Sequence, residues 1–269
     1  MDLRAMMIGA HPDDPEASAG GTALKYLDAG WTVMFVSLTN GDAGHQTMAR
    51  AELAERRRRE ADQVARIAGL EYVVFDEHDG ELQPTLDVRR RLIGVIRAFA
   101  PDIVFSHPLV DYHPDHRYTS QIVMDTAYML GVPAANTVVP AIRKRPVYAW
   151  YASGRMPRVD AFTVAVDTTD VWDRKIDLLD AHESQMYEWL PFDAGDLDQV
   201  PATPEARKEW LSARWRVRAG AAATAYRDRL IAVYGRQRAD QVATAEVFTA
   251  SPVSLQLTEA NYRDYFPFL

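Results

Sequence analysis

Short apolar runs alternate with longer helix-like segments through the first 130 residues, and this alternation restricts the folds open to the chain. Runs rich in β-branched and aromatic residues predict buried strands, and the segments between them predict helices. Regular alternation of the two indicates a Rossmann-like α/β fold, in which a mainly parallel sheet is flanked by helices. The predicted strands are 4–10, 32–38, 71–75 and 102–106, and the predicted helices are 18–29, 48–68, 87–99 and 116–130.

The rest of the chain is less regular. We expect a single domain over residues 1–269, with 1–130 as the core α/β part and 131–269 as a C-terminal elaboration that closes the cleft. The further elements predicted in this elaboration are strands at 147–151 and 161–166, a helix at 171–189, and a long helix at 204–234 whose continuity is left open.

Composition narrows the classes of function. The net charge of −8 argues against nucleic acid as a partner. No run of eighteen apolar residues is present, and the first apolar stretch is too short for a signal peptide, so we expect a cytoplasmic protein without a membrane span. The acidic, cysteine-free composition fits a homo-oligomer. Because cysteine is absent, a metal site has to use His, Asp and Glu.

Polar clusters with metal-binding potential follow two of the predicted strands. His11, Asp13 and Asp14 come directly after the first strand, in the sequence AHPDDPEASAGGT. The second cluster lies in DYHPDHRYT, after the fourth strand, and contains His113, Asp115 and His116. Ligands of open α/β sheets bind beyond the carboxyl ends of the strands, so both clusters lie where a site is expected.

These residue types favour a catalytic metal over a structural one. A single His-Pro-Asp is also a good turn before a helix, but two copies after parallel strands favour a metal site. Two His and one carboxylate leave one position of a tetrahedral zinc open, as in zinc hydrolases, whereas a structural zinc is closed by four protein ligands. The same ligands would accept iron or cobalt. A G-x-G-x-x-G fingerprint is absent, which disfavours nicotinamide cofactors.

With these motifs in view, the chain resembles the PIG-L or LmbE-like family of zinc N-deacetylases over most of its length. The resemblance is carried by AHPDDPEASAGGT at 10–22, LTNGDAGH at 38–45, HPDH at 113–116 and, more weakly, AHESQ at 181–185. The resemblance implies a zinc-dependent hydrolase that removes an acyl group from the nitrogen of an amino sugar or a similar small polar amide. Acetyl is the first candidate for this acyl group. Competing activities are cleavage of a larger amide such as a thiol conjugate, and hydrolysis of an O-acetyl ester. A non-enzymatic binding protein is disfavoured, because the motif residues are all present.

The resemblance also implies a role for each motif residue. His11, Asp14 and His116 would bind zinc, and Asp13 would be the general base that takes a proton from water. His113 would stabilise the oxyanion and help to protonate the leaving amine, and Asp115 would orient a histidine.

Substrate contacts and one departure from the family are less well defined. Pro15 stands where many members have Glu directly after the HPDD motif, and Glu16 follows it. His107 and His78 are interpreted as structural or surface residues. The candidate substrate-binding residues are Asp42, Arg57, Asp111 and His182.

Overall fold

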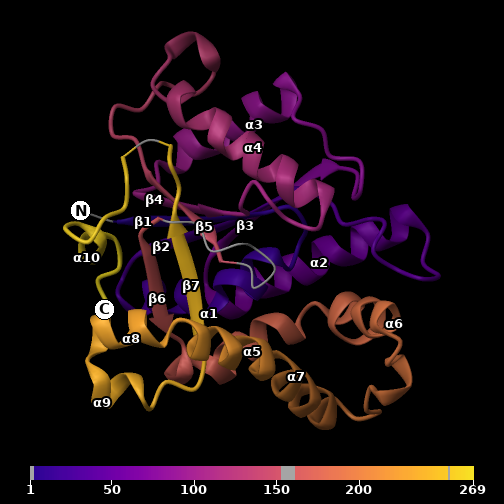
Figure 1. Ribbon diagram of the computed structural model, residues 1–269. Coiled ribbons are helices and arrows are strands. Elements are labelled where there is room, and N and C mark those ends of the chain that lie inside the picture. Colours follow the sequence, from indigo (N-terminus) through magenta and orange to yellow (C-terminus); the bar gives the residue numbers. More distant parts are fainter. Residues whose placement is uncertain (1–2, 153–160, 254) are drawn as a thin grey trace.

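One seven-stranded sheet forms the centre of the computed structural model, which describes residues 3–152, 161–253 and 255–269 (Figure 1). Its strand order is β3-β2-β1-β4-β5-β7-β6. The pairings from β3 to β5 are parallel, and β7 alone runs antiparallel to its neighbours in this sheet, so the mainly parallel sheet is confirmed. The strands are β1 (Arg4–Gly9), β2 (Thr32–Thr39), β3 (Glu71–Glu77), β4 (Ile103–Ser106), β5 (Val147–Tyr151), β6 (Thr163–Asp167) and β7 (Ala245–Ala250).

Helices cover both faces of this sheet, and the alternation of side chains along each strand explains why. On β1, Met6 and Ile8 face a core shared with α3 and α4, whereas Ala5 and Met7 face a core shared with α1. Figure 1 shows α3 and α4 on one side of the sheet and α5 and α7 on the other. The main helices are α1 (Asp14–Asp28), α2 (Arg50–Ala68), α3 (Leu86–Phe99), α4 (Pro114–Met129), α5 (Trp172–Asp180), α7 (Pro204–Ala225) and α8 (Arg227–Tyr234).

Short helical segments complete the described chain. Within the described ranges, none of the helices reaches the length and apolar character that crossing a bilayer requires. The short segments are η1 (Pro133–Ala135), η2 (Thr169–Val171), the π-helical η3 (Ser184–Trp189), α6 (Leu190–Ala194), η4 (Leu197–Gln199), α9 (Arg236–Ala239) and α10 (Tyr262–Tyr265).

The six predicted strands are present, with small shifts at their ends, but three features differ from prediction. Helix α1 begins at Asp14 rather than at residue 18, because Pro15 fits the first turn of a helix, where its missing N–H is not needed. The helix predicted at 171–189 is broken between α5 and η3, where Ser184 turns its backbone N–H and hydroxyl to the Glu60 carboxylate. Strand β7 was not predicted.

The sheet reverses its direction of winding between β1 and β4. The chain passes from β1 outward to β2 and β3, and then returns to β4 on the other side of β1 before continuing to β5. Loops that follow β1 and β4 therefore diverge to opposite faces and leave a crevice at the carboxyl edge.

The buried carboxylate of Glu246 joins β7 to both α1 and α5. Glu246 accepts hydrogen bonds from the backbone N–H groups of Gly21 (2.9 Å) and Thr22 (2.7 Å), and it pairs with Lys175 (2.6 Å). A Cβ atom at Gly21 would lie 2.7 Å from a side-chain carbon of Thr168, so only glycine allows this approach.

Gly21→Ala is expected to lower the thermal unfolding midpoint, because overpacking costs about 1–3 kcal/mol and a domain of this size loses roughly 2–4 °C per kcal/mol. Gly20→Ala is the matched control: its Cβ would meet nothing closer than 3.6 Å, so stability should stay equal or rise. Calorimetry of both variants checks this, and equal midpoints would contradict the packing argument.

Candidate metal centre

The loops after β1 and β4 meet at the carboxyl edge of the sheet, where their polar residues face one another. Each loop ends in the first turn of a helix, with Pro15 in α1 and Pro114 in α4. The ring centroids of His11 and His116 are 5.3 Å apart, although the two residues belong to different loops. The sequence-predicted residues of both clusters are thus brought together in the crevice.

Asp14 has one carboxylate oxygen fixed by the protein and the other turned to His116. Its Oδ2 accepts the backbone N–H groups of Ala10 (3.0 Å) and His11 (2.8 Å), and it lies 3.2 Å from His107 Nε2 and 3.3 Å from His11 Nδ1. Its Oδ1 lies 3.4 Å from His116 Nε2. Oδ1 is therefore the oxygen best placed to bind a cation.

Carboxylates orient both His11 and His116 by contacting one ring nitrogen of each. His116 Nδ1 lies 3.0 Å from Asp111 Oδ1, which leaves Nε2 for a ligand. His11 Nε2 lies 3.1 Å from Asp79 Oδ1 and 3.3 Å from Asp115 Oδ2, which leaves Nδ1 on the side of Asp14. Histidines that bind metals in proteins typically donate their other N–H to a carboxylate in this way.

The donor set therefore fits a divalent cation. Burial and the dense packing of carboxylates around imidazoles are what an N/O metal site requires. In the described chain, three groups of residues have ligand atoms that all lie within 4.8 Å of one another. The predicted trio of His11, Asp14 and His116 shares two members with each of the first two groups. The three such groups are His11/His113/His116, Asp14/His107/His116 and His11/Asp79/Asp115.

Asp13 lies beside these residues in an unusual backbone conformation. Its φ of 135° is rare for a residue with a side chain, and such strain concentrates at functional sites. Its Oδ2 lies 3.0 Å from Arg57 Nη2. Burial raises the pKa of Asp13 to about 6, although Arg57 favours the charged form. A carboxylate with a pKa near neutrality is suited to take up and release a proton.

His113 caps α4 and faces both histidines of the predicted trio. Its Nδ1 accepts the backbone N–H of Asp115 (3.2 Å), so in the neutral ring Nε2 carries the proton. Its ring centroid lies 4.7 Å from that of His11 and 5.1 Å from that of His116. Burial and the neighbouring His11 and His116 lower the pKa of His113, so the ring is a neutral donor near pH 7.

Two predicted substrate contacts, Asp42 and His182, are buried and contact other protein groups. Asp42 is buried and accepts from the backbone N–H of Asp79 (3.0 Å), and it lies 2.6 Å from His78 Nδ1. His182 is fully buried and pairs with Glu16 (2.8 Å). Both side chains have protein partners, and their assignment as substrate contacts stays a prediction.

The other two predicted substrate contacts also serve the protein itself. Arg57 is only 2% exposed and pairs with Asp13. Asp111 is nearly buried, and its carboxylate lies against His116. Both groups thus have protein partners, and their assignment as substrate contacts stays a prediction.

Sequence reasoning missed two residues of the centre. His107 stacks on His116 with centroids 3.9 Å apart, and burial lowers the pKa of His107 to about 4, so its ring is neutral. Asp79 contacts His11, and this hydrogen bond overcomes the effect of burial and lowers the pKa of Asp79. Both residues follow parallel strands at the carboxyl edge, which is the signal that could have identified them.

Exposed apolar side chains border the centre on the loop after β4. Leu109, Val110 and Tyr112 are 42%, 61% and 64% exposed. The Tyr112 ring centroid lies 5.3 Å from that of His116. Aromatic and aliphatic groups next to a polar centre provide a surface for the apolar face of a ligand.

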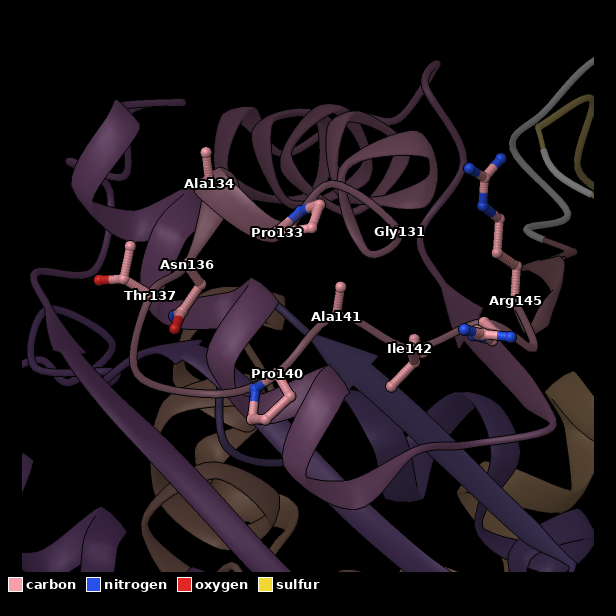
Figure 2. A pocket seen from close by; sticks show the side chains of 10 residues that line it. Gly131, Pro133, Ala134, Asn136, Thr137, Pro140, Ala141, Ile142 and Arg145 are labelled. Atoms are coloured by element: carbon pink, nitrogen blue, oxygen red, sulfur yellow. The ribbon is translucent and has the colours of Figure 1, made fainter.

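A separate cavity of about 850 Å³ lies at the opposite edge of the sheet. Figure 2 shows it in the segment between the end of α4 and the start of β5. Parallel strands begin at this edge, so the cavity is remote from the metal centre. Its lining includes Gly131, Pro133, Asn136, Pro140, Ile142 and Arg145.

Comparisons with known proteins show which family this chain belongs to. Residues 6–127 match the PIG-L family model, described as GlcNAc-PI de-N-acetylase. Diacetylchitobiose deacetylase of Thermococcus kodakarensis is 30% identical over 204 residues, which cover 70% of this chain and 74% of the relative. The 4-oxalmesaconate hydratase of Pseudomonas putida is 27% identical over 198 residues, with coverages of 69% and 75%.

A solved structure extends the similarity to almost the whole fold. N,N'-diacetylchitobiose deacetylase of Pyrococcus horikoshii, complexed with its inhibitor MPG, superposes with a TM-score of 0.68 at 25% identity, covering 93% of this chain and 84% of that one. Matching motifs, shared fold and identity across most of both chains lead to one conclusion: the chain belongs to the PIG-L family of LmbE-like deacetylases.

Proposed function

We propose that this protein is a zinc-dependent hydrolase that removes the N-acetyl group from an amino sugar or a similar small amide. One observation carries the proposal: three ligand atoms, His11 Nδ1, Asp14 Oδ1 and His116 Nε2, lie beside a strained Asp13 carboxylate at the switch point of the sheet. Relatives named as deacetylases of diacetylchitobiose, of N-acetylglucosaminyl malate and of an acetamido-sugar inositol support the substrate class.

His11, Asp14 and His116 would hold the metal. A divalent ion held there supplies Lewis acidity, which polarises the amide carbonyl and makes water a stronger acid. Asp13 takes a proton from the attacking water, and its pKa of about 6 allows the proton to be given up again. The Nε2–H of His113 donates to the carbonyl oxygen as negative charge develops there.

Cleavage of the C–N bond and transfer of the proton to nitrogen then complete the reaction. Water contributes its oxygen to the acetyl carbon, and the C–N bond breaks. The proton held by Asp13 passes to the departing nitrogen, with His113 assisting, so that acetate and a free amine leave. The first turns of α1 and α4 point their N–H groups toward this region, which favours negative charge in the transition state.

Hydration of an unsaturated bond is the second candidate, because one relative is a hydratase. A hydratase also needs a base next to an activated water, so the centre itself would serve that reaction. Three relatives are named as deacetylases of N-acetylated sugars, and one is named as a hydratase. We therefore place an N-acetyl sugar first, ahead of a hydratase substrate, a larger amide or an O-acetyl ester.

The composition of the chain also bears on its compartment and partners. We propose that the enzyme acts in the cytoplasm on a small molecule, as a single-domain protomer of a homo-oligomer, without nucleic acid or a membrane as partner. The net charge of −8 supports the exclusion of nucleic acid.

Zinc-loaded protein is expected to release acetate and amine in equal amounts from at least one N-acetyl amino sugar. Treatment with a chelator should abolish this release and added zinc should restore it, because the metal supplies the Lewis acid. A panel that also contains 4-oxalmesaconate, a thiol-conjugate amide and an O-acetyl sugar separates the alternatives. Acetate release that persists at full rate without metal would refute the proposal.

Asp111→Asn is expected to weaken zinc binding roughly 10- to 100-fold, because the carboxylate that orients a metal-binding histidine is replaced by a neutral amide. Competition with a colorimetric chelator measures the affinity. Asp125→Asn is the control, since Asp125 lies on α4, the helix that carries His116, is exposed and pairs with Arg89. An unchanged affinity together with a raised KM would instead indicate that Asp111 contacts substrate.

A further inference from the structure

One buried arginine holds the walls of the cavity between α4 and β5 in place. Arg97 of α3 is only 3% exposed, and its side chain donates to five backbone carbonyls at 2.6–3.1 Å. A guanidinium has five N–H donors, so all of them are engaged. The segment around the cavity is therefore fixed to α3 at several points. The acceptors are the carbonyls of Met129, Leu130, Val132, Asn136 and Val139.

The side chain of Asn136 stiffens the same segment from within. Its Oδ1 accepts the backbone N–H groups of Val138 (3.0 Å) and Val139 (2.8 Å), and its Nδ2 donates to the backbone carbonyl of Arg90 on α3 (3.2 Å). A ligand that enters a cavity with fixed walls loses little free energy to ordering of the protein, and small-molecule sites are usually formed in advance in this way. The walls of this cavity are thus suited to hold a small molecule.

The charge of the cavity lining is opposite to that of the protein as a whole. The chain has a net charge of −8, yet the ten lining residues include Arg143 and Arg145 and no acidic residue (Figure 2). In the part of the chain that the structure describes, neither arginine pairs with a carboxylate, whereas Lys144 between them pairs with Asp102. A local excess of positive charge in a concave site attracts an anion.

Arg145 is oriented by the end of α4. Its guanidinium carbon lies 5.1 Å from the centroid of the Tyr128 ring, and a Cβ atom at Gly131 would lie 3.0 Å from its Nη2. Within the described ranges its N–H groups donate to no protein oxygen, so they are available to an acceptor in the cavity. Stacking on an aromatic face leaves the donor edge of a guanidinium free. Figure 2 shows Arg145 at one end of the lining and Thr137 at the other.

The size and the chemistry of the lining indicate the class of anion. The cavity of about 850 Å³ has the volume of a small-molecule site, which is about 300–1,000 Å³. Pro133, Pro140 and Ile142 add apolar surface for a ring or a carbon skeleton. Two guanidinium groups balance a phosphate monoester, whose charge is about −1.5 to −2 at pH 7, better than a single carboxylate. Their planar donor pairs also match phosphate oxygens.

We propose that the cavity between α4 and β5 is a second binding site, which takes a small phosphorylated molecule. Arg143 and Arg145 bind its phosphate, and the prolines and Ile142 contact the rest of it. The site lies at the sheet edge opposite to the metal centre, so its ligand is distinct from the amide that the proposed function hydrolyses. The proposal therefore does not depend on the proposed function.

Titration calorimetry of the whole chain with glucose 6-phosphate tests the proposal, with glucose and succinate as comparison ligands. Glucose 6-phosphate should bind more tightly than either. The double variant Arg143→Ala/Arg145→Ala should weaken its binding by roughly tenfold or more, because hydrogen bonds between charged groups are lost. The matched control is Arg58→Ala/Arg59→Ala, which removes two exposed charges that pair with Glu55 on α2 and should bind as wild type does. An equal loss in both double variants, or no binding by the wild-type protein, would overturn the proposal.

Phosphate also binds metal ions, so the titration is run with zinc-loaded and with chelated protein. Equal affinities are expected, and binding that disappears with the metal would overturn the proposal. A crystal structure with glucose 6-phosphate locates the ligand directly: its phosphate should lie between Arg143 and Arg145, and a phosphate found at the metal centre alone would contradict this placement. Unchanged zinc content and thermal midpoint in Arg143→Ala/Arg145→Ala would show that lost binding does not reflect unfolding.

Discussion

The parallel pairing of β1 with β4 is the constraint on which the rest of the site depends. The register that sets Ala5 opposite Ile103 and Met7 opposite Phe105 ends both strands at one edge of the sheet. The two loops that follow them are separated by about a hundred residues in sequence, yet they bring His11, Asp14 and His116 together. A fold with this switch point thus converts two short motifs into one centre.

Partners around the centre determine what its residues can do. Asp111 leaves one nitrogen of His116 free, and Asp79 and Asp115 do the same for His11. Arg57 pairs with the Asp13 carboxylate and donates to the backbone carbonyl of Pro12. The arrangement is preorganised, since its charged side chains are already held by the protein before a substrate arrives. Preorganisation of this kind accounts for much of the rate enhancement in hydrolytic sites.

Local patterns predicted the strands and the two loops that carry the candidate metal ligands, because both depend on residues close in sequence. Long-range partners could not be predicted. Asp42, Arg57 and His182 have the chemistry of substrate contacts, and only the packing of distant elements shows that they are buried. Strand β7 escaped prediction because Glu246 interrupts its apolar pattern, and the compensating Lys175 and the N–H groups of Gly21 and Thr22 lie far away in the sequence.

The central claim is that the loops after β1 and β4 together form one metal site. Anomalous scattering at the zinc edge from crystals of the zinc-loaded protein tests it most directly. The account predicts one strong peak per chain, bonded to His11 Nδ1, Asp14 Oδ1 and His116 Nε2. A dominant peak at His11, Asp79 and Asp115 without Asp14 and His116, or no ordered peak from protein with bound zinc, would contradict it.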